Sequence, residues 1–161
     1  MAFMGPGGNW SVSKMIVNNE GVWVIRNFIY PNDYPQIQRL WSEAGPGVRL
    51  GRSDTPPEII KKLQRDPDLF LVAESEGCIV GSVVGGFDGR RGLVYHLAVD
   101  ESLRQQGLGT HLMEELEQRL RDKGCLRCYL LVTKDNPEAI HFYEGRGWQR
   151  MDLFTYGKDL V

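Results

Sequence analysis

The sequence predicts an α/β (α+β) fold, in which a mixed, mostly antiparallel central sheet of six to seven strands is flanked by about four helices. Three β-rich runs separated by tight turns follow one another between positions 68 and 99. A long amphipathic stretch at 107–123 comes next and leads into a further β-rich run. A run of antiparallel strands followed by a β-α-β crossover closes most simply as one sheet with helices on both faces.

The first half of the chain begins with a strand and two helices. Residues 21–28 are β-branched and aromatic, which is typical of a strand. Residues 33–44 should form a helix, because Ile37, Leu40 and Trp41 would share one face. Glycines and prolines make 45–57 a loop, and a second helix should begin at its final prolines after the capping residue Thr55.

The second half contains the remaining elements. The predicted strands are 68–74, 78–87, 93–99, 127–132 and 148–156, and the predicted helices are 107–123 and 136–144. In the first of these helices a leucine recurs every four residues, so one face is apolar. Gly124 suits the end of that helix, and Asn136-Pro137 suits the start of the other.

Composition and charge narrow the class of protein. The chain has 161 residues and a formal net charge of -2, so it is not expected to bind nucleic acid. It has no apolar run of the roughly 20 residues that a membrane helix needs and no signal peptide, so we expect a cytoplasmic protein that does not bind membranes. Three cysteines fit a reducing compartment.

Two further expectations concern domains and metals. Residues 1–20 are rich in glycine and asparagine and should form a flexible leader, either native or added for expression, followed by a single domain over 21–161. Cys125 and Cys128 have the spacing of a redox pair or half a zinc site, but no second metal pair follows. Along one extended segment their side chains would point to opposite faces, and no metal site is expected.

The segment Arg104-Gln105-Gln106-Gly107-Leu108-Gly109 connects an apolar strand to the long helix. The first turn of a helix carries N–H groups without internal partners and a partial positive charge, so it attracts phosphate. Glycines would leave room for the anion, and Arg104 would add a permanent positive charge. The spacing excludes a dinucleotide fingerprint, because position 112 is Leu112, and a Walker A loop lacks its lysine. An isolated Gly-x-Gly could equally serve packing alone.

Leu97-Ala98-Val99, the motif Arg104-x-x-Gly107-x-Gly109, Asn136 and Phe142-Tyr143-Glu144 together resemble the GNAT superfamily of acetyl-CoA-dependent N-acetyltransferases. The resemblance covers roughly residues 70–148 and agrees with the strand order above. The stretches Leu69–Glu74 and Gly85–Gly89 are similar to small bacterial acetyltransferases of the YpeA type.

The resemblance implies a set of coenzyme contacts. The turn and the start of its helix would hold the pyrophosphate of acetyl-CoA, the cosubstrate, and main-chain groups of the preceding strand would pair with the pantetheine arm. The implied coenzyme-binding residues are Leu97, Ala98, Val99, Arg104, Gln105, Gln106, Gly107, Leu108, Gly109, Thr110 and Asn136. Asn136 could instead only cap its helix.

The resemblance also implies a catalytic acid. Tyr143 lies two helical turns after Asn136 and would donate a proton to the departing thiolate, unless it is only a packed aromatic residue. Relatives use a glutamate as base, but the matching positions here are Leu93 and Leu131. His96, beside Tyr95 on the strand next to the coenzyme, is the candidate base, unless it is only a packed or surface imidazole. In that case a chain of water molecules could take the proton, or the acceptor amine could have a lowered pKa.

The resemblance implies that the first two helices and their loop at 45–57 choose the acceptor. Arg49, Arg52 and Asp54 are the candidate substrate-binding residues of this loop. The leading hypothesis is an acetyltransferase that moves the acetyl group to a primary amine of a small molecule or a peptide by direct attack, as a monomer or a homodimer. A second hypothesis is a non-catalytic sensor of acyl-CoA, and a third is an interaction domain without a ligand. Coenzyme binding and thiol release would separate the three.

Overall fold

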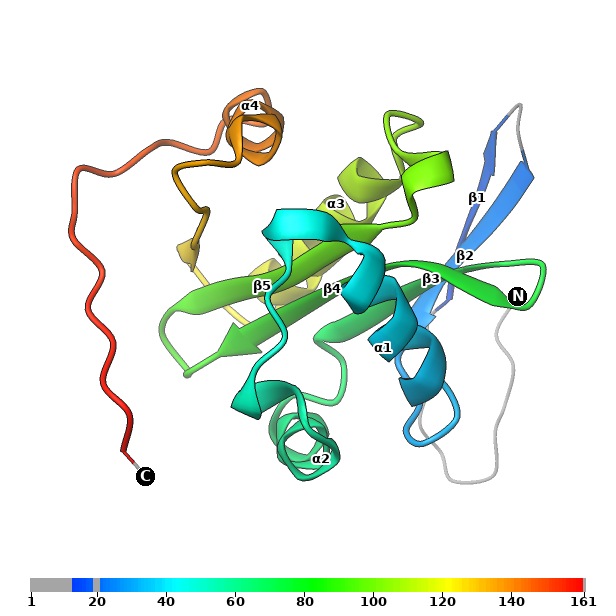
Figure 1. Ribbon diagram of the computed structural model, residues 1–161, viewed down its shortest axis with the longest axis horizontal. Coiled ribbons are helices and arrows are strands. Elements are labelled where there is room, and N and C mark those ends of the chain that lie inside the picture. Colours follow the sequence, from blue (N-terminus) through cyan, green and yellow to red (C-terminus); the bar gives the residue numbers. More distant parts are fainter. Residues whose placement is uncertain (1–12, 19–20, 161) are drawn as a thin grey trace. The chain divides into compact units, whose positions relative to one another are not determined.

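The computed structural model describes residues 13–18 and 21–160 and contains two compact units, one ending at Leu131 and the other beginning at Val132. The first unit contains one six-stranded sheet in the order β1-β2-β3-β4-β5-β6 (Figure 1). All neighbouring strands are antiparallel except β5 and β6. The predicted fold class, a mixed and mostly antiparallel sheet with four helices, is confirmed.

The elements lie close to the predicted positions. The strands are β1 (Lys14–Asn18), β2 (Gly21–Asn27), β3 (Phe70–Ser75), β4 (Cys78–Phe87), β5 (Gly92–Val99) and β6 (Cys128–Leu130). The helices are α1 (Tyr34–Glu43), α2 (Pro56–Arg65), α3 (Leu108–Asp122) and α4 (Pro137–Glu144), with short 3-10 turns η1 (Gly45–Gly47), η2 (Arg52–Asp54) and η3 (Glu101–Leu103).

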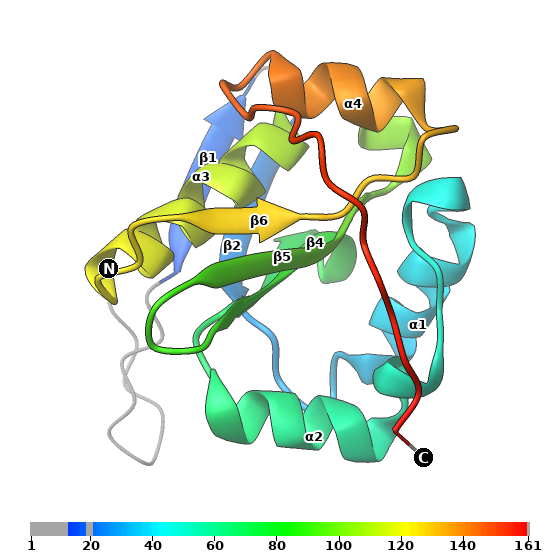
Figure 2. The same ribbon diagram turned by 90° about the vertical axis from the view of Figure 1, so that its left-hand side faces the viewer.

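In the first unit, α1 and α3 lie on opposite faces of the sheet (Figure 2), and residues of β4 contact both helices. Gly81 and Gly85 face α3, and a Cβ atom at Gly85 would lie 2.6 Å from Cδ1 of Leu116. Ser82, between them, accepts a buried hydrogen bond of 2.9 Å from Nε1 of Trp41 in α1. Glycine at position 85 therefore lets α3 approach the strand closely.

The core on the α1 side is aromatic. The rings of Phe28 and Phe70 stack with centroids 4.1 Å apart, and Trp41 stacks on Phe70 at 5.8 Å. All three side chains are buried. This packing holds α1 against β3 and β4, which fixes the helix that borders the candidate site.

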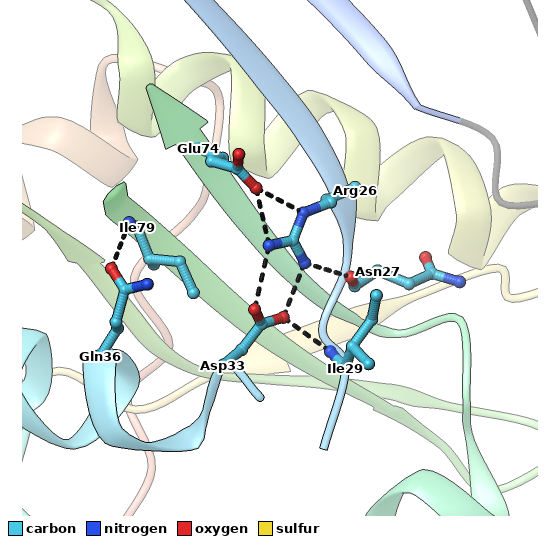
Figure 3. A network of polar contacts seen from close by, with 7 residues as sticks. All are labelled: Arg26, Asn27, Ile29, Asp33, Gln36, Glu74 and Ile79. Carbon is cyan, nitrogen blue, oxygen red and sulfur yellow. Dashed lines mark hydrogen bonds and ion pairs between the residues drawn. The ribbon is translucent and has the colours of Figure 1, made fainter. Parts of the chain in front are cut away.

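A polar network holds the connection between β2 and α1 (Figure 3). Arg26 contacts both carboxylate oxygens of Asp33, at 2.6 and 3.0 Å, and its Nε lies 2.8 Å from Glu74 of β3. Asp33 also accepts a hydrogen bond of 2.7 Å from the backbone N–H of Ile29. The hydrogen bond to Asp33 raises the pKa of Arg26, against the opposing effect of burial. The bidentate pair thus fixes the entry to α1.

The expected leader contains a strand, which corrects part of the sequence prediction. Residues 14–18 form β1, whose Ile16 pairs with Trp23 and whose Met15 pairs with Val24 of β2. β-branched and long apolar side chains in this run suit a strand once β2 offers a neighbour, and the nearby glycines and asparagines obscure that signal. The rest of the expected leader, residues 1–12 and 19–20, lies outside the described residues.

The unit that begins at Val132 contains α4 but not the expected last strand. Residues 149–160 have no regular secondary structure, and the side chains of Leu153, Phe154 and Tyr156 are exposed. An apolar run becomes a strand only when it hydrogen-bonds to a neighbour, and no strand in the described part of the chain pairs with this one. The chain clusters into two compact units, divided after Leu131, and the single domain over 21–161 stays a prediction.

Among the described residues, no helix combines the length and the apolar character needed to cross a bilayer.

Candidate active site

The turn before α3 has the backbone geometry that an anion site requires. Gly107 occupies the cap position of the helix with φ of 92°, and Gln105, two residues earlier, has φ of 64°. Within residues 13–18 and 21–160, no side chain caps this end of the helix. The α-helical bond from His111 N to Gly107 O measures 3.1 Å, so the N–H groups of residues 108–110 have no partner four residues earlier.

The space above this turn is open. A Cβ atom placed on Gly107 would meet no heavy atom within 4 Å, so the glycine is required by its positive φ and not by packing. Leu108, in contrast, is buried and anchors the start of the helix in the core. The first turn of α3 therefore offers N–H groups at the helix end that carries partial positive charge. We call residues 104–110 the amide notch.

Arg104, which was expected to add a positive charge to the amide notch, is held by two backbone carbonyl groups. Its Nε donates to the carbonyl oxygen of Val99 at 3.2 Å, and its Nη2 donates to that of Ala44 at 3.3 Å. Arg104 therefore joins the end of β5 to the end of α1, because a guanidinium has enough donors to bridge two carbonyl groups. Gln106 makes a similar local contact, from Nε2 to the carbonyl oxygen of Ser102 at 3.2 Å.

The edge of β5 that leads to the amide notch is not covered by β6. The pairing of β6 is limited to residues 92–94 of β5, so residues 95–99 extend beyond it. Asp100 N donates to Val80 O of β4 at 2.9 Å. Main-chain groups of successive strand residues point to opposite edges, so those of Val99 and Leu97 point away from β4 and toward the open edge. Ala98, between them, is buried.

A cavity of about 470 Å³ lies next to the end of this edge. It is bordered by the last residues of α1 and by the residues that follow β5, including Glu43, Ala44, Val99 and Glu101. There is thus room beside the open edge on its α1 side.

His96 and Asp54 are brought together, although the sequence placed them in different roles. Nε2 of His96 lies 2.7 Å from Oδ1 of Asp54. Only 20% of the His96 side chain and 9% of the Asp54 side chain are exposed. The ring of His96 also lies against Trp41, with centroids 4.7 Å apart. The imidazole is thus held between an indole and a carboxylate.

A β-bulge places His96 in this position. The pairing of β4 and β5 shifts between Ser82 and Val84, so that β5 contains one extra residue. His96 lies in the bulge with φ of 45°, a conformation that non-glycine residues rarely adopt. The bulge turns the imidazole of His96 toward α1 and η2. Such bulges commonly redirect a side chain beside a functional site.

Tyr95, the residue before His96, is partly exposed. Burial of part of its ring raises its pKa, and Asp66 of α2 raises it further. A phenol with a raised pKa stays protonated at neutral pH, which makes it a poor base. Asp66 itself lies 2.5 Å from Nζ of Lys62, whose pKa is lowered by burial.

The two arginines expected to bind substrate lie on the surface. Arg49 and Arg52 are both exposed, in the segment that joins α1 to α2. Asp54, the third candidate, is instead engaged by protein groups: besides His96, Gly51 N donates to its Oδ2 at 2.7 Å. Both carboxylate oxygens of Asp54 thus contact protein groups, and its role in binding the acceptor stays a prediction.

The unit that begins at Val132 carries the remaining two candidates. Oδ1 of Asn136 accepts a hydrogen bond of 3.1 Å from Ala139 N, so Asn136 caps α4. The ring of Tyr143 packs edge-on against Phe142 and Trp148, with centroids 5.1 and 5.9 Å apart. Burial raises the pKa of Tyr143 to about 12, although Arg146 lowers it slightly. The phenol is therefore protonated over the whole physiological range.

A family model for the acetyltransferase (GNAT) family matches residues 34–148. The chain belongs to this family. An acetyltransferase of Pectobacterium atrosepticum is 44% identical over 130 residues, which are 81% of this chain and 91% of that protein. Among solved structures, Ard1 from Thermoplasma volcanium has a TM-score of 0.68 at 29% identity, covering 78% of this chain and 81% of that one. PaiA N-acetyltransferase from Thermoplasma acidophilum, solved with coenzyme A, has a TM-score of 0.71 at 18% identity, covering 82% and 92%.

Membership of the GNAT family makes this protein an acetyltransferase with acetyl-CoA as cosubstrate. The N–H groups at the start of α3 have no helical partner four residues earlier, and residues 95–99 of β5 lie beyond the pairing with β6. The binding of acetyl-CoA by these groups stays a prediction. The narrower resemblance to the YpeA type stays a prediction.

Sequence reasoning missed the contacts that hold His96. Asp54 and His96 are 42 residues apart, and no motif links them. Trp41 was expected only as a core residue, yet it also contacts the imidazole. The bulge could not have been found either, because no glycine marks the strand at that position.

Proposed function

We propose that this GNAT enzyme transfers the acetyl group of acetyl-CoA directly to a primary amine of a small molecule or a peptide. The amide notch would hold the diphosphate, and Leu97 and Val99 would hydrogen-bond to the pantetheine arm. His96 would take the proton from the amine, and Tyr143 would stabilise the departing thiolate.

One observation carries this proposal: the open edge of β5 leads to the amide notch. Main-chain groups of Leu97 and Val99 face that edge beyond the pairing with β6, and an extended amide-containing chain can pair with them as another strand would. The carbonyl oxygen of Val99 already accepts one hydrogen bond from Nε of Arg104, so it would use its second lone pair for such a chain. The N–H groups at the start of α3 then lie where a diphosphate can follow. The edge of β5 and the first turn of α3 follow one another along the chain. A ligand with two amides followed by a diphosphate could bind both of them.

A base is required because an alkyl amine is mostly protonated at neutral pH. With a pKa of about 10.4, roughly one lysine side chain in 2,500 is unprotonated at pH 7. The glutamates used by some relatives correspond here to Leu93 and Leu131, and Leu131 is 69% exposed. Neither can accept a proton. His96 is the side chain on the same strand that can do so, and its imidazole is partly open to solvent.

Tyr143 is better suited to donate a hydrogen bond than to transfer its proton. Its pKa of about 12 lies well above that of a free thiol, which is about 8.5. Full transfer of the proton to a thiolate would therefore be uphill by roughly 5 kcal/mol. A charge-assisted hydrogen bond to the developing thiolate stabilises it without that cost.

The acceptor would approach past the segment between α1 and α2. Arg49 and Arg52 are exposed there, and either could orient a carboxylate of the acceptor. The proposal therefore includes amines that carry an acidic group, whether free or at the end of a peptide.

Incubation with acetyl-CoA and a panel of primary amines tests this function. Release of the free thiol, together with a product heavier by one acetyl group, would support it. The second hypothesis, a sensor of acyl-CoA, is favoured by the two leucines at the glutamate positions. Binding of acetyl-CoA without turnover of any amine in the panel would support the sensor and overturn the proposed reaction.

A further inference from the structure

We infer that Asp54 is a positioning residue for His96, holding Nε2–H of the imidazole so that Nδ1 is the atom that accepts the proton. This inference rests on the proposed transfer to an amine, and it assigns to Asp54 a role in orienting the base in place of one in binding the acceptor.

The first step is the contact itself. The separation of 2.7 Å between His96 Nε2 and Asp54 Oδ1 is that of a strong, charge-assisted hydrogen bond. Because little of either side chain is exposed, water competes weakly for this bond.

The second step is that Asp54 is itself fixed. Its Oδ2 accepts from Gly51 N at 2.7 Å, across the turn η2. Its carbonyl oxygen accepts from the hydroxyl of Tyr34 at 3.0 Å, and that hydroxyl accepts from Nε2 of Gln38 at 2.9 Å. Backbone and side chain of Asp54 are therefore held from both η2 and α1, and one carboxylate oxygen is directed at the imidazole.

The third step concerns the proton on the ring. An ionised carboxylate can only accept hydrogen bonds, so Nε2 must be the nitrogen that carries hydrogen. In a neutral imidazole the other nitrogen, Nδ1, then presents its lone pair. No hydrogen bond to Nδ1 is present among residues 13–18 and 21–160. That lone pair therefore has no protein partner in the described ranges, and 20% of the His96 side chain is exposed to solvent.

The fourth step is that the ring cannot easily turn. Trp41 lies against it at 4.7 Å, and Trp41 is itself tied to Ser82 by a buried hydrogen bond of 2.9 Å. A histidine in a strained bulge, between a fixed indole and a fixed carboxylate, keeps one orientation. A base held in this way needs no reorientation before it accepts the proton.

The test compares Asp54→Asn with wild type by two measurements. In the free enzyme, ¹⁵N NMR of the His96 ring reports the tautomer without any substrate. We expect hydrogen on Nε2 in wild type and a mixture of tautomers in Asp54→Asn. In steady-state assays, Asp54→Asn should lower kcat roughly 10- to 100-fold while KM for the amine changes less than about twofold, since a positioned base contributes 10²–10⁴-fold.

Two further variants complete the test. Glu58→Gln removes an exposed carboxylate whose partner is Lys61 on α2, and it should leave tautomer and kcat unchanged. In a His96→Gln background, Asp54→Asn should cause no further loss, because the two residues act as one unit. Equal losses in both backgrounds would overturn the positioning role.

The two proposals fail differently. Hydrogen on Nδ1 in wild type, or an unchanged tautomer in Asp54→Asn, would overturn the role of Asp54 whatever the activity. The expected tautomers with no turnover of any amine would support the positioning of His96 by Asp54 and overturn the proposed reaction.

Discussion

Replacement of Gly107 by alanine should separate coenzyme binding from folding. Gly107 has φ of 92°, and a Cβ atom there would meet nothing within 4 Å. The backbone strain of an alanine at positive φ should lower the free energy of unfolding by about 1–2 kcal/mol. The methyl group would also enter the space above the first turn of α3, where the diphosphate is proposed to lie.

The expected loss of affinity follows from the hydrogen bonds at stake. A hydrogen bond from a backbone N–H to a charged group contributes about 1.5–3 kcal/mol. Loss of one such bond at the amide notch should weaken acetyl-CoA binding roughly 10- to 100-fold. Isothermal titration calorimetry measures this change directly in Gly107→Ala and wild type.

Gly89 provides a matched control. It has φ of 96° and equally open surroundings, but it lies in the turn between β4 and β5. Gly89→Ala should therefore lose similar stability and no affinity. At a concentration 100 times the wild-type Kd, acetyl-CoA should stabilise wild type and Gly89→Ala by about 2.7 kcal/mol. Under the same conditions Gly107→Ala should gain only about 0.4–1.4 kcal/mol.

Thermal unfolding with and without acetyl-CoA measures this stabilisation in wild type, Gly89→Ala and Gly107→Ala. For a chain of this size, 1 kcal/mol corresponds to a change in Tm of about 2–4 °C. If Gly107→Ala and Gly89→Ala respond equally to acetyl-CoA, Gly107 serves only the turn, and the amide notch does not bind the diphosphate.

Four further predictions concern other parts of the molecule. Tyr143→Phe should lower kcat roughly 10- to 100-fold and leave the Kd for acetyl-CoA within about twofold, since only a hydrogen bond formed late in the reaction is lost; unchanged kcat would remove Tyr143 from the reaction. Because burial raises the pKa of Tyr143 to about 12, the stability linked to this phenol is complete below pH 10 and is lost as the pH rises toward 12, which a base titration of tyrosine absorbance checks. Gly85→Ala should destabilise the fold by about 1–3 kcal/mol, because its Cβ would overlap Leu116, and calorimetry should find the same Kd for acetyl-CoA. Asp33→Asn should lower the free energy of unfolding, measured by urea denaturation, by about 3–5 kcal/mol, because Arg26 would lose its bidentate partner in a mostly buried site. A loss below about 1 kcal/mol would show that Glu74 and water replace Asp33.

Much of the sheet could be predicted because local patterns suffice to specify it. The leucines of α3 repeat on one face, and the structure buries Leu108, Leu112, Leu116 and Leu120 together. The turn with Gly77 and the turn with Gly89 separate three β-rich runs, which pair as consecutive antiparallel strands. These features depend on residues close together in the chain.

The elements at the two ends of the chain were harder to predict because a strand needs a partner. The run at 14–18 is short, and it becomes β1 only through pairing with β2. The run at 148–156 looks more like a strand, yet it forms none. β-propensity describes how well a residue suits a sheet and does not supply the neighbouring strand.

The sequence also predicted one part of the candidate site and missed another. The turn at the start of α3 could be predicted from its glycines, and Gly107 has the positive φ that suits glycine. The binding of the diphosphate there stays a prediction. The partners of individual side chains do not follow from spacing, because they depend on packing between distant segments. Arg104 contacts Ala44, and His96 contacts Asp54, across 60 and 42 residues respectively.

A crystal structure of the complex with acetyl-CoA tests the central proposal most directly. We expect the diphosphate oxygens to lie about 2.7–3.2 Å from N–H groups of residues 107–110. We also expect the pantetheine amides to pair with Leu97 and Val99 along the open edge of β5. A coenzyme bound elsewhere, with these N–H groups facing only water or protein atoms, would contradict the proposed binding site.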